Sequence, residues 1–376
     1  MMKLDKKDIL AALETITVSG EGKNMVESGA IQNVITFADE VIVDVTLTTP
    51  ALHIKKRAEA DILKVIQEKV HPEAKVKVNI KVDAPEKPKI KGNAIPGIHN
   101  IVAIASGKGG VGKSTVTANI AVTLAKMGFK VGVLDADIYG PSIPIMFDVA
   151  SERPLSVNVG GKSKMKPVEN YGVKVLSIGF FTQPNQAVIW RGPMAAKALN
   201  QLIFDAAWGE LDFMLIDLPP GTGDIHLSIM QSLPITGAVV VSTPQTVALA
   251  DARKGVAMFR QESIDVPVLG IIENMAYFTP EELPDNKYYI FGKEGARNLA
   301  EDMEIPFLGE IPLVQSIREA GDAGRPAALQ MGTLLEKAFE KLTQNVVQET
   351  VNRNDNLPPT QAIQITTMAG CSAVKN

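Results

Sequence analysis

The chain of 376 residues is poor in cysteine, in aromatic side chains and in long apolar runs. Its one cysteine, Cys371, excludes a disulfide within the chain and is typical of a reducing compartment. Residues 1–10 carry several charges and lack the apolar core of a signal peptide, and no apolar run reaches membrane-spanning length. We therefore expect a cytoplasmic protein that has no membrane partner.

An excess of positive charge is also missing. The chain has 38 Lys and Arg residues and 42 Asp and Glu residues, which gives a formal net charge of −4. Such a chain has no general attraction to nucleic acid, so no nucleic-acid partner is expected. With 45% hydrophobic and 21% charged residues, the chain has the composition of a globular protein with a sizeable core. Its length suits two domains, or one large domain with an appendage.

The most specific motif is Gly-Lys-Gly-Gly-Val-Gly-Lys-Ser-Thr, at residues 107–115. It follows an apolar run at 101–105 that predicts a buried parallel strand, and it precedes apolar residues at helical spacing in 116–127. Glycines in this setting let backbone N–H groups converge on an anion at the start of a helix. The sequence therefore predicts a phosphate-binding loop whose nucleotide contacts come from Gly107, Lys108, Gly109, Gly110, Val111, Gly112, Lys113, Ser114 and Thr115.

The chemistry of this loop predicts the roles of its last polar residues. Lys113 is expected to reach the β- and γ-phosphates of ATP, and the Ser114 hydroxyl is expected to bind Mg²⁺, which prefers oxygen ligands. Asp217 directly follows an apolar run at 211–216 and suits a carboxylate that holds Mg²⁺ through water. The Gly221 N–H is then placed to meet the γ-phosphate.

Polar residues also follow two further predicted strands. Asp135 and Asp137 come after the strand at 130–134; we expect Asp137 to orient the attacking water, whereas Asp135 equally suits a carboxylate that caps a turn. Asn274, after the strand at 266–272, suits either an adenine contact or a turn. The histidines lack metal-ligand spacing and are interpreted as packing or surface residues: His53, His71, His99 and His226.

Periodicity along the chain predicts an α/β protein. Residues 1–83 form a small α/β domain, with helices at 4–14 and 54–70 and strands near 41–47 and 75–82. Residues 84–97 are a linker rich in proline and lysine. Residues 98–350 form the P-loop ATPase domain, a mostly parallel sheet flanked by helices, which closes with a helix at 334–347. Its remaining strands are expected at 173–178 and 237–242, and residues 351–376 are expected to be a flexible tail.

Taken together, five motifs resemble those of the Mrp/ApbC family of iron–sulfur cluster carrier ATPases, related to MinD and ParA: residues 107–115, 135–142, 190–194, 217–224 and 273–275. The amino-terminal domain is similar to the MIP18 type. The resemblance implies a homodimer that hydrolyses ATP to load or release a cluster, with apo iron–sulfur proteins or assembly factors as partners. Lys108 matches the lysine of the deviant Walker A group, which reaches the partner subunit's phosphates; the alternative is a solvated loop charge.

The chain departs from this family where iron is concerned. Members that bind a bridging [4Fe–4S] cluster usually carry Cys-x-x-Cys shortly after Glu-Asn-Met, but residues 277–292 contain no cysteine, and neither do residues 48–52 of the amino-terminal domain. Cys371 is the only possible cysteine ligand, contributed once by each chain of a dimer, or else a tail residue without function.

Three hypotheses remain for the function. The first is an ATP-driven carrier with altered cluster ligands, and the second is a nucleotide-switched regulatory ATPase that binds no cluster. The third is a positioning ATPase similar to ParA or MinD, which the acidic charge and the lack of a basic terminal helix oppose.

Overall fold

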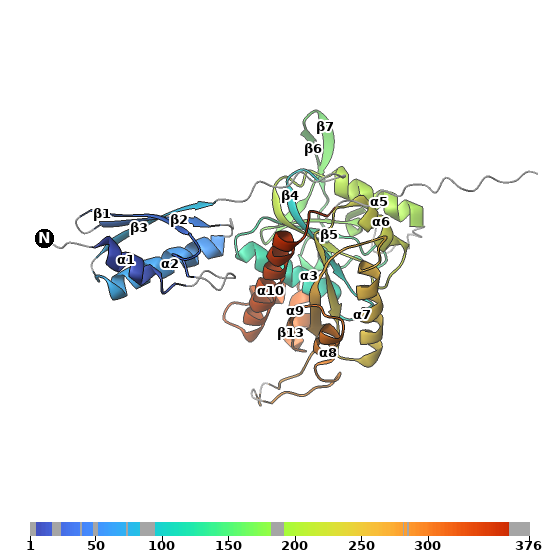
Figure 1. The fold of residues 1–376 in the computed structure, drawn as a ribbon. Helices are drawn as coiled ribbons and strands as arrows, with labels where there is room; N and C mark the ends of the chain where they lie inside the picture. The colour runs from blue at the N-terminus through green and yellow to red at the C-terminus, as the bar shows by residue number, and fades with distance from the viewer. Residues whose placement is uncertain are drawn as a thin grey trace, which may run out of the picture. The chain divides into compact units, whose positions relative to one another are not determined.

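The computed structural model describes residues 5–16, 24–37, 40–47, 52–72, 74–82, 95–181, 192–280, 282–283 and 286–360. The chain divides into two compact units, Met1–Lys89 and Ile90–Asn376 (Figure 1). Residues 84–94, which are most of the predicted linker, lie outside the described residues. Its last residues belong to the second unit, because the apolar side chain of Ile95 is buried in that unit's core.

The first unit is a three-stranded sheet with two helices (Figure 1). Strand β1 (Ile31–Phe37) pairs antiparallel with β2 (Glu40–Leu47), which pairs parallel with β3 (Lys75–Val82). Alternate residues of β2 are buried, as expected for a sheet with one face in the core, and α1 (Lys6–Leu13) and α2 (Leu52–Lys69) supply the other half of that core. Strand β1 was not predicted, since Gln32 and Asn33 interrupt its alternation.

The second unit contains an eight-stranded sheet in which all neighbours pair parallel except β8 and β9. In spatial order the strands are β13 (Phe307–Ile311), β12 (Val268–Asn274), β11 (Gly237–Ser242), β4 (Ile98–Ala105), β10 (Leu211–Asp217), β5 (Val131–Asp135), β9 (Val173–Ser177) and β8 (Val168–Asn170). Every predicted strand is present. The short edge strands β8 and β13 were missed, as was the exposed hairpin of β6 (Leu155–Val159) and β7 (Lys162–Lys166).

Helices cover both faces of this sheet. One face shares a core with α5 (Gly192–Phe204), α6 (Asp224–Ser232), α7 (Thr246–Phe259) and α8 (Gly295–Asp302). The other elements are α3 (Lys113–Lys126), α4 (Ile143–Met146), η1 (Ile178–Phe181), α9 (Gln315–Asp322), η2 (Ala327–Leu329) and α10 (Leu334–Asn356), of which α3 and α10 pack together on the opposite face. Burial on both faces explains why the central strands are continuous apolar runs. No helix in the described part of the chain is both long and apolar enough to cross a bilayer.

The carboxyl-terminal helix is longer than predicted. Helix α10 continues to Asn356, so residues 351–356, which were expected in a flexible tail, are helical. The polar residues of its last turns make specific contacts: the Arg353 guanidinium donates to the Pro358 carbonyl and to Thr360 Oγ1, each at 2.7 Å, and Asn354 Nδ2 donates to Asn100 Oδ1 at 2.8 Å. The polar composition of residues 351–356 was therefore not evidence of a flexible tail. Residues 361–376, with Cys371, lie outside the described residues.

Candidate nucleotide-binding site

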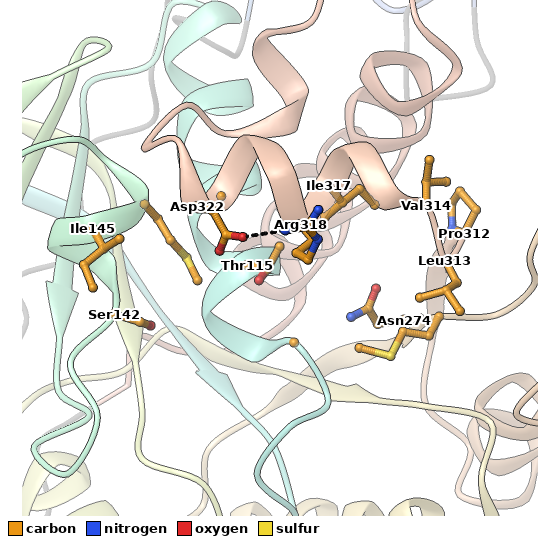
Figure 2. A pocket seen from close by; sticks show the side chains of 14 residues that line it. Thr115, Ser142, Ile145, Asn274, Pro312, Leu313, Val314, Ile317, Arg318 and Asp322 are labelled. Atoms are coloured by element: carbon orange, nitrogen blue, oxygen red, sulfur yellow. Dashed lines mark hydrogen bonds and ion pairs between the residues drawn. The ribbon is translucent and has the colours of Figure 1, made fainter.

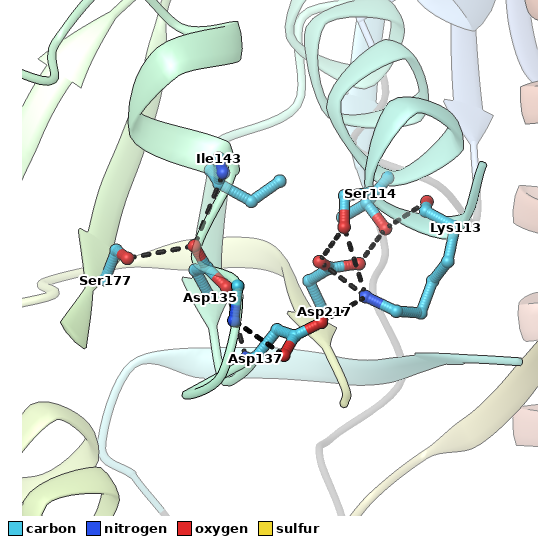
Figure 3. A network of polar contacts seen from close by, with 9 residues as sticks. Lys113, Ser114, Asp135, Asp137, Ile143, Ser177 and Asp217 are labelled. Atoms are coloured by element: carbon cyan, nitrogen blue, oxygen red, sulfur yellow. Dashed lines mark hydrogen bonds and ion pairs between the residues drawn. The ribbon is translucent and has the colours of Figure 1, made fainter. Parts of the chain in front are cut away.

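The carboxyl ends of three neighbouring strands bring the predicted polar residues together (Figure 3). Strand β10 lies between β4 and β5, and its last residue, Asp217, is in register with Ile104 and with Asp135. The phosphate-binding loop joins β4 to α3, which begins at Lys113. The sheet topology therefore places the loop, Asp217 and Asp135 at one edge.

Two glycines of the loop are required by close contacts. A Cβ atom at Gly107 would lie 2.1 Å from the Asp251 carbonyl carbon, because the backbone of α7 presses on the loop. Gly112 has a left-handed φ of +83°, and a Cβ atom there would lie 2.2 Å from Asn274 Nδ2. The loop is thus held from two sides, while Lys108, Gly109 and Gly110 are exposed.

Lys113, Ser114 and Asp217 form the centre of the site (Figure 3). The Lys113 ammonium lies 2.7 Å from Asp217 Oδ2, and the Ser114 hydroxyl donates to the same oxygen at 2.5 Å. Thr117 donates to the other oxygen, Oδ1, at 2.7 Å. Sequence reasoning missed Thr117, although it lies four residues after Lys113 and therefore on the same side of α3.

Burial sets the electrostatics of the two aspartates beside this centre. Asp135 is fully buried and accepts hydrogen bonds from Ser177 Oγ at 2.9 Å and from the backbone N–H groups of Asp137 and Ile143. Burial, and then the charge of Asp217, raise the pKa of Asp135 to about 8. These contacts are those of a turn-capping residue.

Asp137 has a different environment. Its side chain is partly exposed, and its Oδ2 lies 3.9 Å from the Lys113 ammonium. Burial raises the pKa of Asp137, and the positive charge of Lys113 partly offsets that rise. Asp137 is therefore a carboxylate with increased proton affinity that faces the phosphate-binding lysine.

A pocket of about 360 Å³ opens beside the loop (Figure 2). Its lining is largely apolar and comes from the loop, from the residues after β12 and β13, and from α4 and α9, including Gly112, Thr115, Ile145, Met275, Leu313 and Ile317. Asn274 also lines the pocket, and its Nδ2 donates to the Val111 carbonyl at 2.8 Å. The amide therefore supports the phosphate-binding loop, a contact that neither interpretation of Asn274 included.

The segment Met275–Glu294, which follows β12, contains aromatic and lysine side chains that contact one another. Phe278 and Tyr288 exchange two backbone hydrogen bonds of 2.8 Å, which close the segment on itself. The Lys287 ammonium lies 3.8 Å from the centre of the Tyr277 ring and 3.5 Å from Glu310 Oε1. Within the described ranges, no group of three or more His, Cys, Asp or Glu side chains is arranged to hold a metal ion.

This segment is anchored at both ends by consecutive residues of β12. Asn274 holds the phosphate-binding loop, as described, and Glu273 accepts a hydrogen bond of 2.5 Å from the Ala296 N–H at the start of α8. Glu273 is buried, and burial raises its pKa.

Residues 97–347 match the family model described as NUBPL iron-transfer P-loop NTPase. The chain belongs to this family. In the amino-terminal unit, residues 6–80 match a second family model, that of an iron-sulfur cluster assembly protein. The match of an iron-transfer NTPase confirms the resemblance drawn from the motifs, and membership of the NUBPL family supports nucleotide hydrolysis in general.

Two curated relatives of this NUBPL-family chain share a name. An iron-sulfur cluster carrier protein of Synechocystis sp. is 42% identical over 319 residues, which cover 85% of this chain and 90% of that protein. Another, of Aquifex aeolicus, is 47% identical over 273 residues, or 71% of this chain and 73% of that protein. A nucleotide-binding protein of Archaeoglobus fulgidus, solved with ADP, is 42% identical with a TM-score of 0.53, over 61% of this chain and 87% of that one.

Most predicted site residues of this NUBPL-family chain therefore lie at one edge of the sheet. The structure brings together the loop 107–115, Asp137, Asp217 and Asn274, and the Gly221 N–H donates to the Ser106 carbonyl at 2.9 Å. Cys371 and the first residues of the 190–194 motif lie outside the described residues.

Proposed function

We propose that this chain is an ATP-dependent carrier that binds an iron–sulfur cluster as cargo and delivers it to apo iron–sulfur proteins. The contact of Lys113 and Ser114 with Asp217, in a chain of the iron-transfer NTPase family, is the observation that carries the proposal. Relatives named iron-sulfur cluster carrier proteins support the cargo.

The site has one region that suits the phosphates of ATP and a second region that suits its nucleoside. The first N–H groups of α3 and the Lys113 ammonium favour the phosphates, since both present positive charge at the same point. The neighbouring apolar pocket suits the nucleoside. Because Asn274 Nδ2 donates to Val111, its Oδ1 is the atom that accepts from the adenine amino group.

The oxygen atoms at the centre of the site fit Mg²⁺. Ser114 Oγ and Asp217 Oδ2 lie 2.5 Å apart, and both are hard oxygen ligands of the kind that this ion prefers. When bound, Mg²⁺ supplies positive charge to the β- and γ-phosphates. Asp137, with its increased proton affinity, orients the attacking water, and the Gly221 N–H exchanges the Ser106 carbonyl for the γ-phosphate.

The active form in this proposal is a homodimer. Lys108 is exposed at the tip of the loop, where it can extend to the phosphates bound by a partner subunit. The added charge stabilises the transition state for phosphoryl transfer.

A regulatory ATPase that binds no cluster is the second candidate. It is favoured by the segment Met275–Glu294, where aromatic rings and lysines stand in place of the expected thiolates.

In the proposed carrier, Cys371 of each chain supplies one ligand, and cysteines of a client or a small thiol complete the set of four.

Anaerobic reconstitution with iron and sulfide tests the carrier against the regulator. Wild type is expected to retain iron and sulfide through gel filtration, whereas Cys371→Ser is expected to lose the iron and keep its ATPase activity. Equal iron in both variants would exclude Cys371 as a ligand. No specific iron in either would support the regulatory ATPase.

A further inference from the structure

The hairpin of β6 and β7 has one open edge (Figure 1). On the outer side of β7, the Met165 N–H donates to the Asp205 carbonyl at 2.8 Å, and the Ala207 N–H donates to the Met165 carbonyl at 2.7 Å. Strand β7 is therefore bonded on both sides. In the part of the chain that the structure describes, β6 pairs only with β7, so its other edge has no strand partner.

The same contacts decide which backbone groups of β6 face the open edge. Met165 lies opposite Ser156 in the hairpin and directs its N–H and C=O groups away from β6. Two opposite residues of an antiparallel pair either bond to each other or both direct these groups outward. The N–H and C=O groups of Ser156 therefore point to the open edge, and so do those of Asn158, two residues further along.

The sequence of β6 lacks the usual protection of an edge strand. Such strands commonly carry charged residues or proline, which prevent pairing with another chain. The residues of β6 are Leu-Ser-Val-Asn-Val, and the side chains of Leu155 and Val159 are 67% and 47% exposed. The three lysines of the hairpin lie instead on the inner strand, β7: Lys162, Lys164 and Lys166. Strand β6 is thus suited to accept a further strand.

The lysines determine which charge the added strand should carry. Each lysine lies opposite an apolar residue of β6, so the lysines and the apolar row share one face of the hairpin. None of the three forms an ion pair with another described residue. An added strand would lie roughly 10 Å from β7, a separation that a lysine and a glutamate side chain can span together. Acidic side chains on this face would therefore be favoured.

The other face of the hairpin borders a cavity of about 610 Å³. Ser156 and Met165 line it from the hairpin, and Phe181 and Leu202 line it from η1 and α5. The Phe181 side chain is 55% exposed. Since successive side chains of a strand point to opposite faces, every second residue of an added strand would point to this side, where the apolar lining favours apolar groups.

We propose that β6 is a docking site for an extended segment of a partner protein, in which acidic and apolar residues alternate and which adds to the hairpin as a third strand. Backbone hydrogen bonds to Ser156 and Asn158 provide affinity, and the lysines and the cavity select the side chains. Two β6 strands from two copies would bring the lysines of both hairpins to one face, which opposes self-association. The cavity shares no lining residue with the nucleotide pocket, and the proposal does not depend on ATP hydrolysis.

A fluorescein-labelled decapeptide of alternating glutamate and valine is the first probe. Fluorescence anisotropy with the full chain measures its binding, which is expected to weaken as salt is raised. A peptide with lysine in place of each glutamate is the control and is expected to bind at least about tenfold more weakly, because like charges repel. Absence of binding by the glutamate peptide, or equal binding by both, would overturn the proposal.

Two N-methylated forms of the glutamate peptide test the backbone bonds without any change in the protein. Methyl groups on the valine nitrogens block the N–H groups that an antiparallel strand donates to Ser156 and Asn158. Methyl groups on the glutamate nitrogens block those that a parallel strand donates. One form is expected to bind about tenfold more weakly, because several hydrogen bonds are lost, and its identity gives the strand direction. Unchanged binding of both forms would refute strand addition.

Substitution of Ser156 tests the open edge from the side of the protein. Ser156→Pro removes an outward N–H, which an edge strand tolerates, and is expected to weaken peptide binding about tenfold. Ser156→Ala is the matched control: it loses the 2.7 Å hydroxyl contact with Ser163 but keeps the N–H, so its affinity should stay within about twofold of wild type. Equal affinity in the two variants would contradict the proposed edge.

The charge of β7 is tested by Lys162→Gln combined with Lys166→Gln. This pair is expected to weaken peptide binding about threefold to tenfold, as the loss of two exposed ion pairs does. Lys337→Gln with Lys341→Gln, two exposed lysines of α10, removes the same charge elsewhere and should have no effect. Anionic phosphatidylserine vesicles that bind wild type and Ser156→Pro equally, without peptide binding, would assign the lysines to a lipid surface. Dimers that Ser156→Pro dissociates would assign the edge to a second copy. Either result would overturn the proposal.

Discussion

The nucleotide site and the segment Met275–Glu294 both follow the carboxyl ends of strands in the same sheet, but their side chains differ in chemistry. In the nucleotide site, Lys113 and Asp217 are 6% and 0% exposed and bonded to each other. In the segment, Leu283 and Ile290 are 48% and 60% exposed, and the lysines lie over aromatic rings. The chain thus has a full set of groups for phosphate and no thiolate in the segment. In the proposed carrier, the nucleotide cycle and the binding of iron are therefore expected to be separable properties.

Lys113→Ala should have the largest effect, because it removes the charge at the centre of the nucleotide site. ATP affinity is expected to fall roughly tenfold to a hundredfold, since a hydrogen bond to a charged group contributes about 1.5–3 kcal/mol. ATP turnover should become undetectable, measured by phosphate release. Lys337→Ala, an exposed lysine on α10, is the control and should match wild type. If Lys113→Ala bound ATP with wild-type affinity, Lys113 would not be a ligand of the phosphates.

Lys108→Ala should slow turnover by about 10²–10³, the usual cost of one transition-state donor. Mixing tests whether the lysine acts on the partner subunit. Subunits with Lys113→Ala keep Lys108 and should restore activity to Lys108→Ala subunits, whereas subunits carrying both substitutions should not. No recovery in dimers shown to be mixed would mean that each site is complete within one chain.

Asp137→Ala should slow turnover about a hundredfold, in the range expected for loss of a group that handles the attacking water. ATP affinity should stay near the wild-type value, because Asp137 is 3.9 Å from the Lys113 ammonium and shares no hydrogen bond with it. Steady-state kinetics measures the turnover, and equilibrium binding measures the ATP affinity. Turnover at the wild-type rate would remove Asp137 from the mechanism.

A pair of cysteines in the segment would test its difference from the nucleotide site directly. The Leu283 N–H donates to the Pro280 carbonyl at 3.1 Å, so these positions lie on one turn with Cys-x-x-Cys spacing. Pro280→Cys with Leu283→Cys should raise the iron retained after anaerobic reconstitution several-fold and leave ATP turnover unchanged. Serines at both positions are the control. Equal iron in the cysteine and serine variants would show that the segment cannot present thiolates to a cluster.

Sequence reasoning succeeded where function is local. The loop 107–115 is contiguous, and Asp217 follows from the rule that parallel strands end at one edge. It failed where a contact joins distant segments: Thr117 meets Asp217 only because α3 lies across β10, and Asn274 meets Val111 only because β12 ends beside the loop. His226, interpreted as a packing or surface residue, is buried, which agrees with the packing alternative.

The anchoring of the segment by Glu273 and Asn274 has a thermodynamic consequence. Consecutive residues of a strand point to opposite faces, so these two join the phosphate-binding loop on one side to the start of α8 on the other. A nucleotide that displaced Val111 would act on the Asn274 end of the segment directly, and on the other end through the neighbouring Glu273. Since such coupling is reciprocal, any molecule that binds the segment more tightly in the ATP state must raise the affinity for ATP by the same factor.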